Sequence, residues 1–242
     1  MRVNIYQIDS EKDTNRTKFR DFRHATSYGE IDPSIYKCVF KGIIKGEDLE
    51  DIYEALNIYN QDYLGIHQGH SLSMSDIVEL EEDVISSRGA KTLKGCYYCD
   101  SVGFKNVIFD TDKCESMDGV RTLMILPHEK PVETRVVDEL DSWQKVVSRR
   151  GEDSMMEVTY PFDDNAVVVG NEEAKLIGME GNRRFGESIY AGPLFIVGDD
   201  GRGGFCDLTD DQIEKYAKMF ENPEDISPEE VENDCGFNIF GF

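Results

Sequence analysis

The chain has 242 residues, of which 39% are hydrophobic, enough to bury one large core or two ordinary ones and too many for global disorder. Asp and Glu total 49 against 26 Lys and Arg, so the formal net charge is −23. A field of that sign excludes direct binding to nucleic acid or to anionic membranes and favours basic partners, although an inert acidic surface is the simpler explanation.

The cellular compartment is predicted from two features. No apolar run approaches the roughly 20 residues of a membrane-spanning helix, and the first residues, MRVNIYQIDSEKD, lack the apolar stretch of a signal peptide. We therefore expect a cytoplasmic protein with free thiols and no disulfide. Its six cysteines are Cys38, Cys96, Cys99, Cys114, Cys206 and Cys235.

The first half of the chain predicts a sheet with one helix. Strands are expected at residues 3–8, 36–44, 77–80, 96–101 and 104–109. The first alternates as a half-buried strand does, and the second is expected to place Tyr36, Cys38 and Phe40 on one face. Residues 47–59 predict an amphipathic helix, and residues 81–94 a polar loop.

Three stretches of this half resemble a known family. They are IYQI at residues 5–8, GHSLSMSDIVEL at 69–80 and YYCDSVGF at 97–104. Together they resemble a YodL-type domain over residues 3–109. That family is known mainly from phage-derived and mobile-element proteins and has no assigned catalytic residues, so the resemblance implies a context and no mechanism.

The polar segment DTDKCESMDG at residues 110–119 has no apolar period, and we interpret residues 111–119 as a linker. Domains are accordingly expected at residues 1–110 and 120–220. The segment begins like a calcium loop, but it lacks that loop's glycine and closing glutamate.

The second half predicts another sheet. Strands are expected at residues 121–126, 132–137, 155–160, 166–169 and 190–197. Helices are expected at 140–147 and, after a capping box at Thr209, to about Phe220. The whole chain is therefore predicted to be α+β, with two small domains, each a mostly antiparallel sheet with one or two helices.

This half also resembles a family, domain of unknown function 3846, over residues 121–220. The likeness lies in these residues: Tyr160-Pro161-Phe162, Asn171-Glu172-Glu173, Lys175-Leu176, Asn182-Arg183, Ala191-Gly192 and Phe195-Ile196-Val197-Gly198. The family has no assigned activity, so the resemblance implies a fold and no reaction.

Residues 221–242 form an acidic tail in this interpretation. It carries seven acidic residues by Asp234 and no basic one, and Ser227-Pro228 is typical of a helix start. The aromatic end at residues 237–242 is expected to dock, either on its own domain or on a partner.

One polar cluster is a candidate for chemistry. Its members are Asn171, Glu172, Glu173, Lys175, Asn182, Arg183 and Arg184. Paired carboxylates beside cations can perform acid–base catalysis if burial separates their pKa values. The alternative, which we favour, is a turn with surface ion pairs worth about 0–1 kcal/mol each.

No catalytic, cofactor or metal site is predicted. Cys96 and Cys99 with His67 and His70 have the residue types of a zinc site, but residues three apart in a strand point to opposite faces. One cysteine is therefore expected in the core and the other at the surface.

The distribution of charge leads to the functional hypothesis. Residues 1–119 carry 14 basic and 22 acidic residues, a net of −8, whereas residues 120–242 carry 12 and 27, a net of −15. The candidate contact residues are Asp199, Asp200, Asp207, Asp210, Asp211, Glu214, Glu221, Glu224, Asp225, Glu229, Glu230, Glu232 and Asp234.

Such carboxylates can imitate the phosphates that a nuclease expects. With the mobile-element context, this predicts a non-catalytic anti-defence inhibitor, of the anti-restriction or anti-CRISPR type, that binds a basic protein such as a host defence nuclease. The alternative is a scaffold or regulatory adapter in the element's own transfer or replication machinery.

Overall fold

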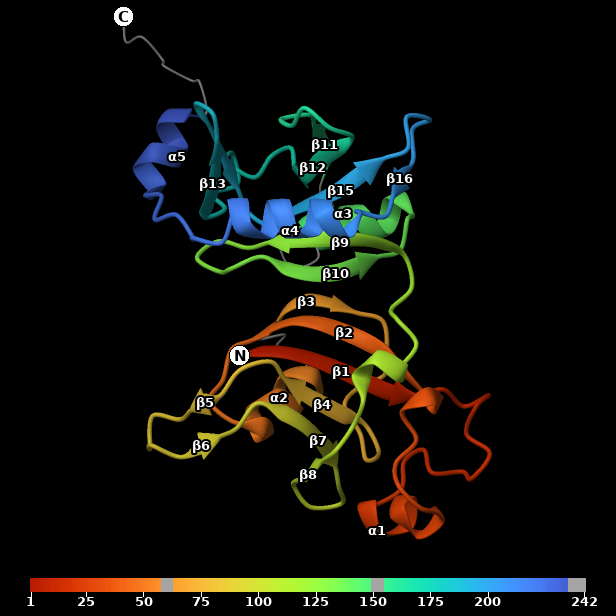
Figure 1. Cartoon of the computed structure of the whole chain (residues 1–242). Helices are drawn as coiled ribbons and strands as arrows, with labels where there is room; N and C mark the ends of the chain where they lie inside the picture. The colour runs from red at the N-terminus through yellow and green to blue at the C-terminus, as the bar shows by residue number, and fades with distance from the viewer. Residues whose placement is uncertain (58–62, 149–154, 235–242) are drawn as a thin grey trace, which may run out of the picture. The chain divides into compact units, whose positions relative to one another are not determined.

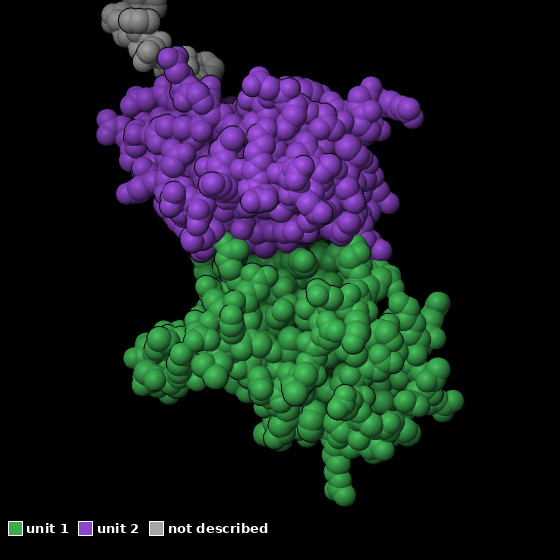
Figure 2. All heavy atoms as spheres, in the orientation of Figure 1, with its two compact units in different colours: residues 1–117 green, residues 118–242 purple. Residues whose placement is uncertain are grey.

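The computed structural model describes residues 1–57, 63–148 and 155–234 (Figure 1). The chain divides into two compact units, Met1–Met117 and Asp118–Phe242, which Figure 2 colours separately. Each unit contains mostly antiparallel strands and a few helices, so the predicted α+β class is confirmed.

Unit 1 is built on an antiparallel sheet. Its described strands, in spatial order, are β3 (Tyr63–His67), β2 (Tyr36–Ile44), β1 (Arg2–Ile8), β4 (Ile77–Leu80), β7 (Gly95–Cys99) and β8 (Phe104–Val107). The helices are α1 (Phe22–Ala25) and α2 (Leu49–Asn57). A small hairpin of β5 (Val84–Ile85) and β6 (Lys91–Thr92) lies in the stretch expected to be a loop.

Both faces of this sheet are covered. One face packs with Ile52 and Leu56 of α2, and the other with the segment around α1 and with Met117. Strand β1 is consequently buried from Val3 to Ile8, including the polar Asn4 and Gln7. The prediction of a half-buried strand was wrong because polar residues on a covered face satisfy their hydrogen bonds internally.

A β-bulge changes the face on which Phe40 lies. The pairing of β1 with β2 shifts between Ile5↔Phe40 and Tyr6↔Cys38, which leaves one extra residue on β2. Tyr36 and Cys38 therefore pack in one core cluster and Phe40 in the other. The expectation that all three share a face was wrong, since a bulge reverses the alternation that follows it.

The segment interpreted as a linker is mostly part of unit 1. The Glu115 amide donates to Tyr36 O at 2.9 Å, the Cys38 amide donates to Glu115 O at 2.8 Å, and Met117 is buried. Backbone pairing of Glu115 with β2 thus holds the end of this segment on the sheet.

Unit 2 contains a second antiparallel sheet. Its described strands, in spatial order, are β10 (Val132–Val136), β9 (Val120–Ile125), β15 (Leu194–Asp199), β12 (Ala166–Asn171) and β11 (Met156–Thr159), and β16 (Phe205–Cys206) pairs with β15. A separate hairpin pairs β13 (Gly181–Phe185) with β14 (Ser188–Ala191).

Helices α3 (Leu140–Val147) and α4 (Asp210–Met219) cover opposite faces of this sheet (Figure 1). Tyr216 of α4 packs with Leu194 and Ile196 of β15. Trp143 of α3 lies 6.0 Å, between ring centroids, from Phe195. Neighbouring residues of a strand point to opposite faces, so the two helices must lie on different sides.

One prediction about this half needs correction, and another is confirmed. The strand expected over residues 190–197 is two strands, because Gly192 has φ +72° and turns the chain between β14 and β15. The helix start predicted at Ser227-Pro228 is confirmed: helix α5 (Pro228–Asp234) begins there and buries Val231, and Ile226 before it packs with Ile189 and Ala191. The aromatic end lies outside the described residues.

Candidate functional site

The predicted polar cluster does not converge on one point. Arg183 and Asn182 are buried, with 1% and 0% of their surfaces exposed. Asn182 donates to Ile125 O and to Gly192 O, at 2.9 and 2.6 Å. These bonds join the β13–β14 hairpin to the end of β9, so Asn182 is a structural residue.

The Arg183 guanidinium is held by oxygen atoms that carry no formal charge. It donates to Asn182 O at 2.9 Å, to Glu129 O at 2.7 Å and to Phe220 O at 3.3 Å. Its Nε has no partner among the described residues. Burial lowers the pKa of Arg183, with Glu224 acting in the opposite sense. These hydrogen bonds connect strand β13 to the segments at Glu129 and Phe220, so the side chain is not available to a ligand.

Arg184 and Glu173 lie at the surface. Arg184 forms ion pairs with Glu224 at 2.9 Å and with Glu230 at 2.7 Å, and so connects β13 to α5. Glu173 is exposed, and its amide donates to Asn171 Oδ1 at 2.8 Å. For these residues the surface ion pair and turn fit better than catalysis.

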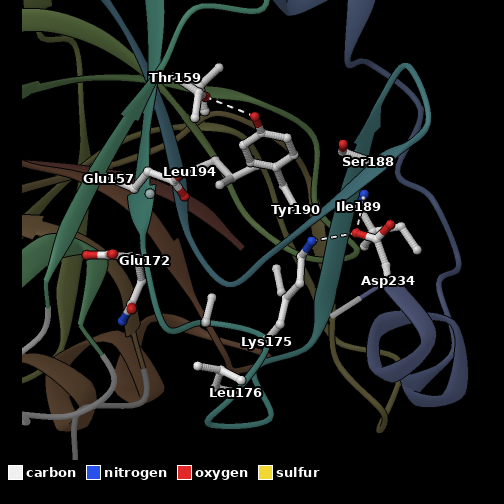
Figure 3. Close-up of a pocket in the computed structure, with 15 residues that line it drawn as sticks. Glu157, Thr159, Glu172, Lys175, Leu176, Ser188, Ile189, Tyr190, Leu194 and Asp234 are labelled. Atoms are coloured by element: carbon white, nitrogen blue, oxygen red, sulfur yellow. Dashed lines mark hydrogen bonds and ion pairs between the residues drawn. The ribbon is translucent and has the colours of Figure 1, made fainter. Parts of the chain in front are cut away.

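The remaining members, Asn171, Glu172 and Lys175, line a pocket of about 360 Å³ (Figure 3). Its walls are β11, β12, β14, the start of β15, the turn after β12 and the end of α5. Lys175 Nζ contacts the Asp234 carboxylate, which also accepts a hydrogen bond from the Ile189 amide at 2.9 Å.

The other polar groups of the pocket stand apart from this ion pair. Tyr190 donates to Thr159 Oγ1 at 3.0 Å, at one end of the pocket (Figure 3). Glu157 and Glu172 lie on the side away from Asp234 in this view, and both are exposed. The polar groups of the pocket therefore lie in separate places, with the Lys175–Asp234 ion pair on one side and Glu157 and Glu172 on the other.

Many of the thirteen candidate contact carboxylates are engaged within the domain. Ion pairs to its own cations hold these six: Asp207, Asp210, Glu221, Glu224, Glu230 and Asp234. Asp199 and Asp200 accept hydrogen bonds from amides of their own hairpin, Gly201 at 2.7 Å and Arg202 at 2.7 Å.

The five others are exposed and form no ion pair with any residue that the structure describes. Asp211 and Glu214 share the solvent face of α4 with Lys215 and Lys218. The rest, Asp225, Glu229 and Glu232, lie on α5 and in the connection before it (Figure 1), and we call them the α5 acidic patch.

A second unusual group, which sequence reasoning missed, lies in unit 1. Asp76 is fully buried, and its Oδ2 accepts hydrogen bonds from Gln7 Nε2 at 3.0 Å and the Ser73 amide at 2.8 Å. Gln7 also forms two hydrogen bonds with the backbone of His70: its Nε2 donates to the His70 carbonyl, and its Oε1 accepts from the His70 amide. Asp76 Oδ1 has no partner in the described part of the chain. Burial raises the pKa of Asp76 well above its ordinary value, against the hydrogen bonds of Ser73 and Gln7.

Comparison with protein families assigns both units. A model of the YodL-like domain matches residues 2–109, and a model of the domain of unknown function DUF3846 matches residues 120–221. The chain is a YodL-like domain followed by a DUF3846 domain. Comparisons with curated proteins and with solved structures find no match. Both resemblances seen in the sequence are confirmed, in the predicted order.

Asp76 should make the stability of the YodL-like domain depend on pH. Its folded pKa is raised, so the stability it contributes is complete below the unfolded pKa of about 4 and is lost as the pH rises toward the folded pKa. The variant D76N stays neutral. Between pH 4.5 and 7.5 the free energy of unfolding should fall in the wild type relative to D76N by about 1 kcal/mol or more.

Urea unfolding at a series of pH values measures this difference, and the comparison with D76N removes the effects of all other carboxylates. D32N, which alters an exposed capping carboxylate, is the control and should follow the wild type. Parallel pH profiles for D76N and the wild type would contradict the burial of a protonated carboxyl group.

The cysteines of the YodL-like domain are buried thiols. Burial raises the pKa of Cys38 to about 11 and the pKa of Cys96 and of Cys99 to about 12. Cys96 and Cys99 are both buried, so the expectation of one surface cysteine was wrong, because both faces of the sheet are covered.

The described residues contain no cluster of metal-ligand side chains and no membrane-spanning helix. Among the described residues no three His, Cys, Asp or Glu side chains gather as a metal site would require. No helix there is long and apolar enough to cross a bilayer.

Proposed function

We propose that this chain is a non-catalytic acidic binding protein whose DUF3846 domain docks on the basic surface of a nucleic-acid-handling protein. The observation that supports it most is the α5 acidic patch. Its three carboxylates are exposed, and no described cation neutralises them. Such groups attract a cationic surface at long range and can form ion pairs with it without first breaking their own.

The spacing of the patch suits a phosphate-binding surface. Glu229 and Glu232 are three residues apart on α5, so their side chains lie on the same side of the helix. They are separated by about 4.5 Å along the helix axis. Phosphates follow one another at roughly 3.4 Å per strand of duplex DNA. Lys and Arg side chains arranged for phosphates can therefore reach both carboxylates.

The α5 acidic patch is a smaller contact surface than the thirteen carboxylates predicted from the sequence. Helix α4 is a weaker candidate because Lys215 and Lys218 lie beside Asp211 and Glu214. Arg184 and Lys175, by contrast, are already bound to acids of α5, so the remaining charge around that helix is negative.

The context implied by the YodL-type resemblance, phage and mobile-element proteins, suggests what the partner is. Such elements gain by blocking host restriction or CRISPR-type nucleases, whose DNA-binding surfaces are basic. We therefore propose an anti-defence inhibitor that acts by stoichiometric occupation of such a surface.

Affinity purification of the tagged chain from host lysate, with mass spectrometry, tests the partner's identity. The proposal expects a basic nuclease, and an association rate that falls steeply with salt. The triple variant D225N/E229Q/E232Q should reduce that rate by about tenfold. The variant D141N/E180Q/E187Q removes the same charge from exposed acids elsewhere in the domain and should retain most of the rate.

The adapter alternative gives a different result. A complex formed only with the element's own transfer or replication proteins, and indifferent to salt and to the triple variant, would exclude the inhibitor and favour the adapter.

A further inference from the structure

We propose that the pocket of the DUF3846 domain binds an aliphatic cation, a methylene chain that ends in an ammonium group, and that a lysine side chain of the docked partner supplies it. The source of the cation rests on the proposed function. The chemistry of the pocket rests on its own walls.

The size and floor of the pocket fit one long side chain. A volume of about 360 Å³ is at the lower end of the range for small-molecule sites, roughly 300–1,000 Å³. The floor includes the buried side chains of Val168, Ala191 and Leu194. Gly170 keeps the floor open, because a Cβ there would lie 3.1 Å from Leu194 Cδ2 and would fill the space above it.

The charges of the pocket favour a cation. Partial burial alone would raise the pKa of Asp234, but Lys175 and the Ile189 amide donate to it and lower the pKa, so this acid is ionised and neutralises Lys175. Glu157 and Glu172 form no ion pair with any described residue. The lining therefore carries a net charge of about −2, which repels an anionic ligand.

The mouth of the pocket suits the stem of a lysine. Leu176 lines it with 67% of its surface exposed. Lysine buries its methylene groups against apolar surface while its ammonium group stays near water and carboxylates. A floor of aliphatic groups with Glu157 and Glu172 on one side presents both environments together (Figure 3).

The site also adjoins the proposed docking surface. Asp234, the last residue of α5, forms part of the pocket wall, and Glu232 of the α5 acidic patch lies two residues before it. Side chains two positions apart on a helix point to opposite sides, so the partner must extend around the C-terminal end of α5 to reach both the patch and the pocket.

NMR titration of the full chain with Nα-acetyl-lysine N-methylamide tests the chemistry. We expect shifts at the amides of Glu172, Lys175 and Ile189 and a Kd of roughly millimolar, as for a ligand of this size. The norleucine derivative, which has the same chain length without the ammonium group, should cause none of these shifts. E157Q/E172Q should raise the Kd about tenfold, whereas E180Q/E187Q should leave it unchanged.

Cadaverine and the partner complex identify the source of the cation. The proposal expects E157Q/E172Q to weaken the partner complex by about tenfold. Shifts with cadaverine and none with the lysine derivative would overturn the assignment to a polypeptide. The pocket proposal fails if neither probe binds and E157Q/E172Q leaves the partner complex intact. The proposed function still stands in that case if D225N/E229Q/E232Q releases the partner. If a probe binds the wild type but not E157Q/E172Q, the cation site is supported. If D225N/E229Q/E232Q also releases no partner, that second result counts against the proposed function alone.

Discussion

Replacing Gly119 with alanine is expected to lower the free energy of unfolding of the DUF3846 domain by about 3–5 kcal/mol. Gly119 has φ +97°, and a Cβ there would lie 2.1 Å from Val136 O, 2.3 Å from Val136 C and 2.5 Å from Val137 N. These are backbone atoms at the end of β10, where Val136 pairs with Val120 of β9. No side-chain rotation relieves the overlap, so the two strands must separate.

Urea unfolding of the full chain measures this loss, and the YodL-like domain should be unaffected. G201A is the matched control. Gly201 has φ +69°, also in the left-handed region, but a Cβ there meets nothing within 4 Å. It should cost only the backbone strain, about 1 kcal/mol. Equal losses in G119A and G201A would show that strain alone, and not the approach of β10, restricts residue 119.

Arg183→Met is expected to destabilise the same domain by about 3 kcal/mol. Methionine retains an aliphatic chain of comparable length, but the carbonyls of Glu129, Asn182 and Phe220 lose the donor that Arg183 provides in the interior. Removing one partner from a buried polar group leaves the other desolvated and unsatisfied.

The neighbouring residue is the control. Arg184→Met removes ion pairs to Glu224 and Glu230 that are partly exposed, so it should cost about 0–1 kcal/mol. Thermal or urea unfolding of both variants gives the comparison. Similar losses in the two would contradict a structural role for Arg183 distinct from a surface ion pair.

These two arginines show what could not be predicted from the sequence. Both were placed in one polar cluster because they are adjacent and alike. The pairing of β13 with β14 shifts register between Gly181 and Arg183, and with this irregularity Asn182 and Arg183 are both buried while Arg184 is exposed. A bulge depends on the partner strand, so residue types alone do not reveal it.

The positions of helices and strands along the chain were more predictable than the burial of individual side chains and the pocket. The strand at residues 36–44 and the helix at 140–147 were predicted with their observed bounds, because hydrophobic period and flanking turn residues are local signals. The short β3 and β13 were missed. The burial of Asp76 depends on Gln7, which is 69 positions away, and the pocket depends on four strands, a turn and a helix that meet only after folding.

The order of strands in the DUF3846 domain has a consequence for its synthesis. Strands β9 and β10 form one local hairpin, β11 and β12 form another, and in the described sheet the two join only through β15. Leu194 pairs with Ile125, which leaves the ribosome 69 residues earlier. At 5–20 residues per second, the open edge of β9 waits roughly 3–14 s for its partner. During that interval the unpaired edge of β9 can pair with other chains, so chaperone binding and translation speed should affect the yield of this domain.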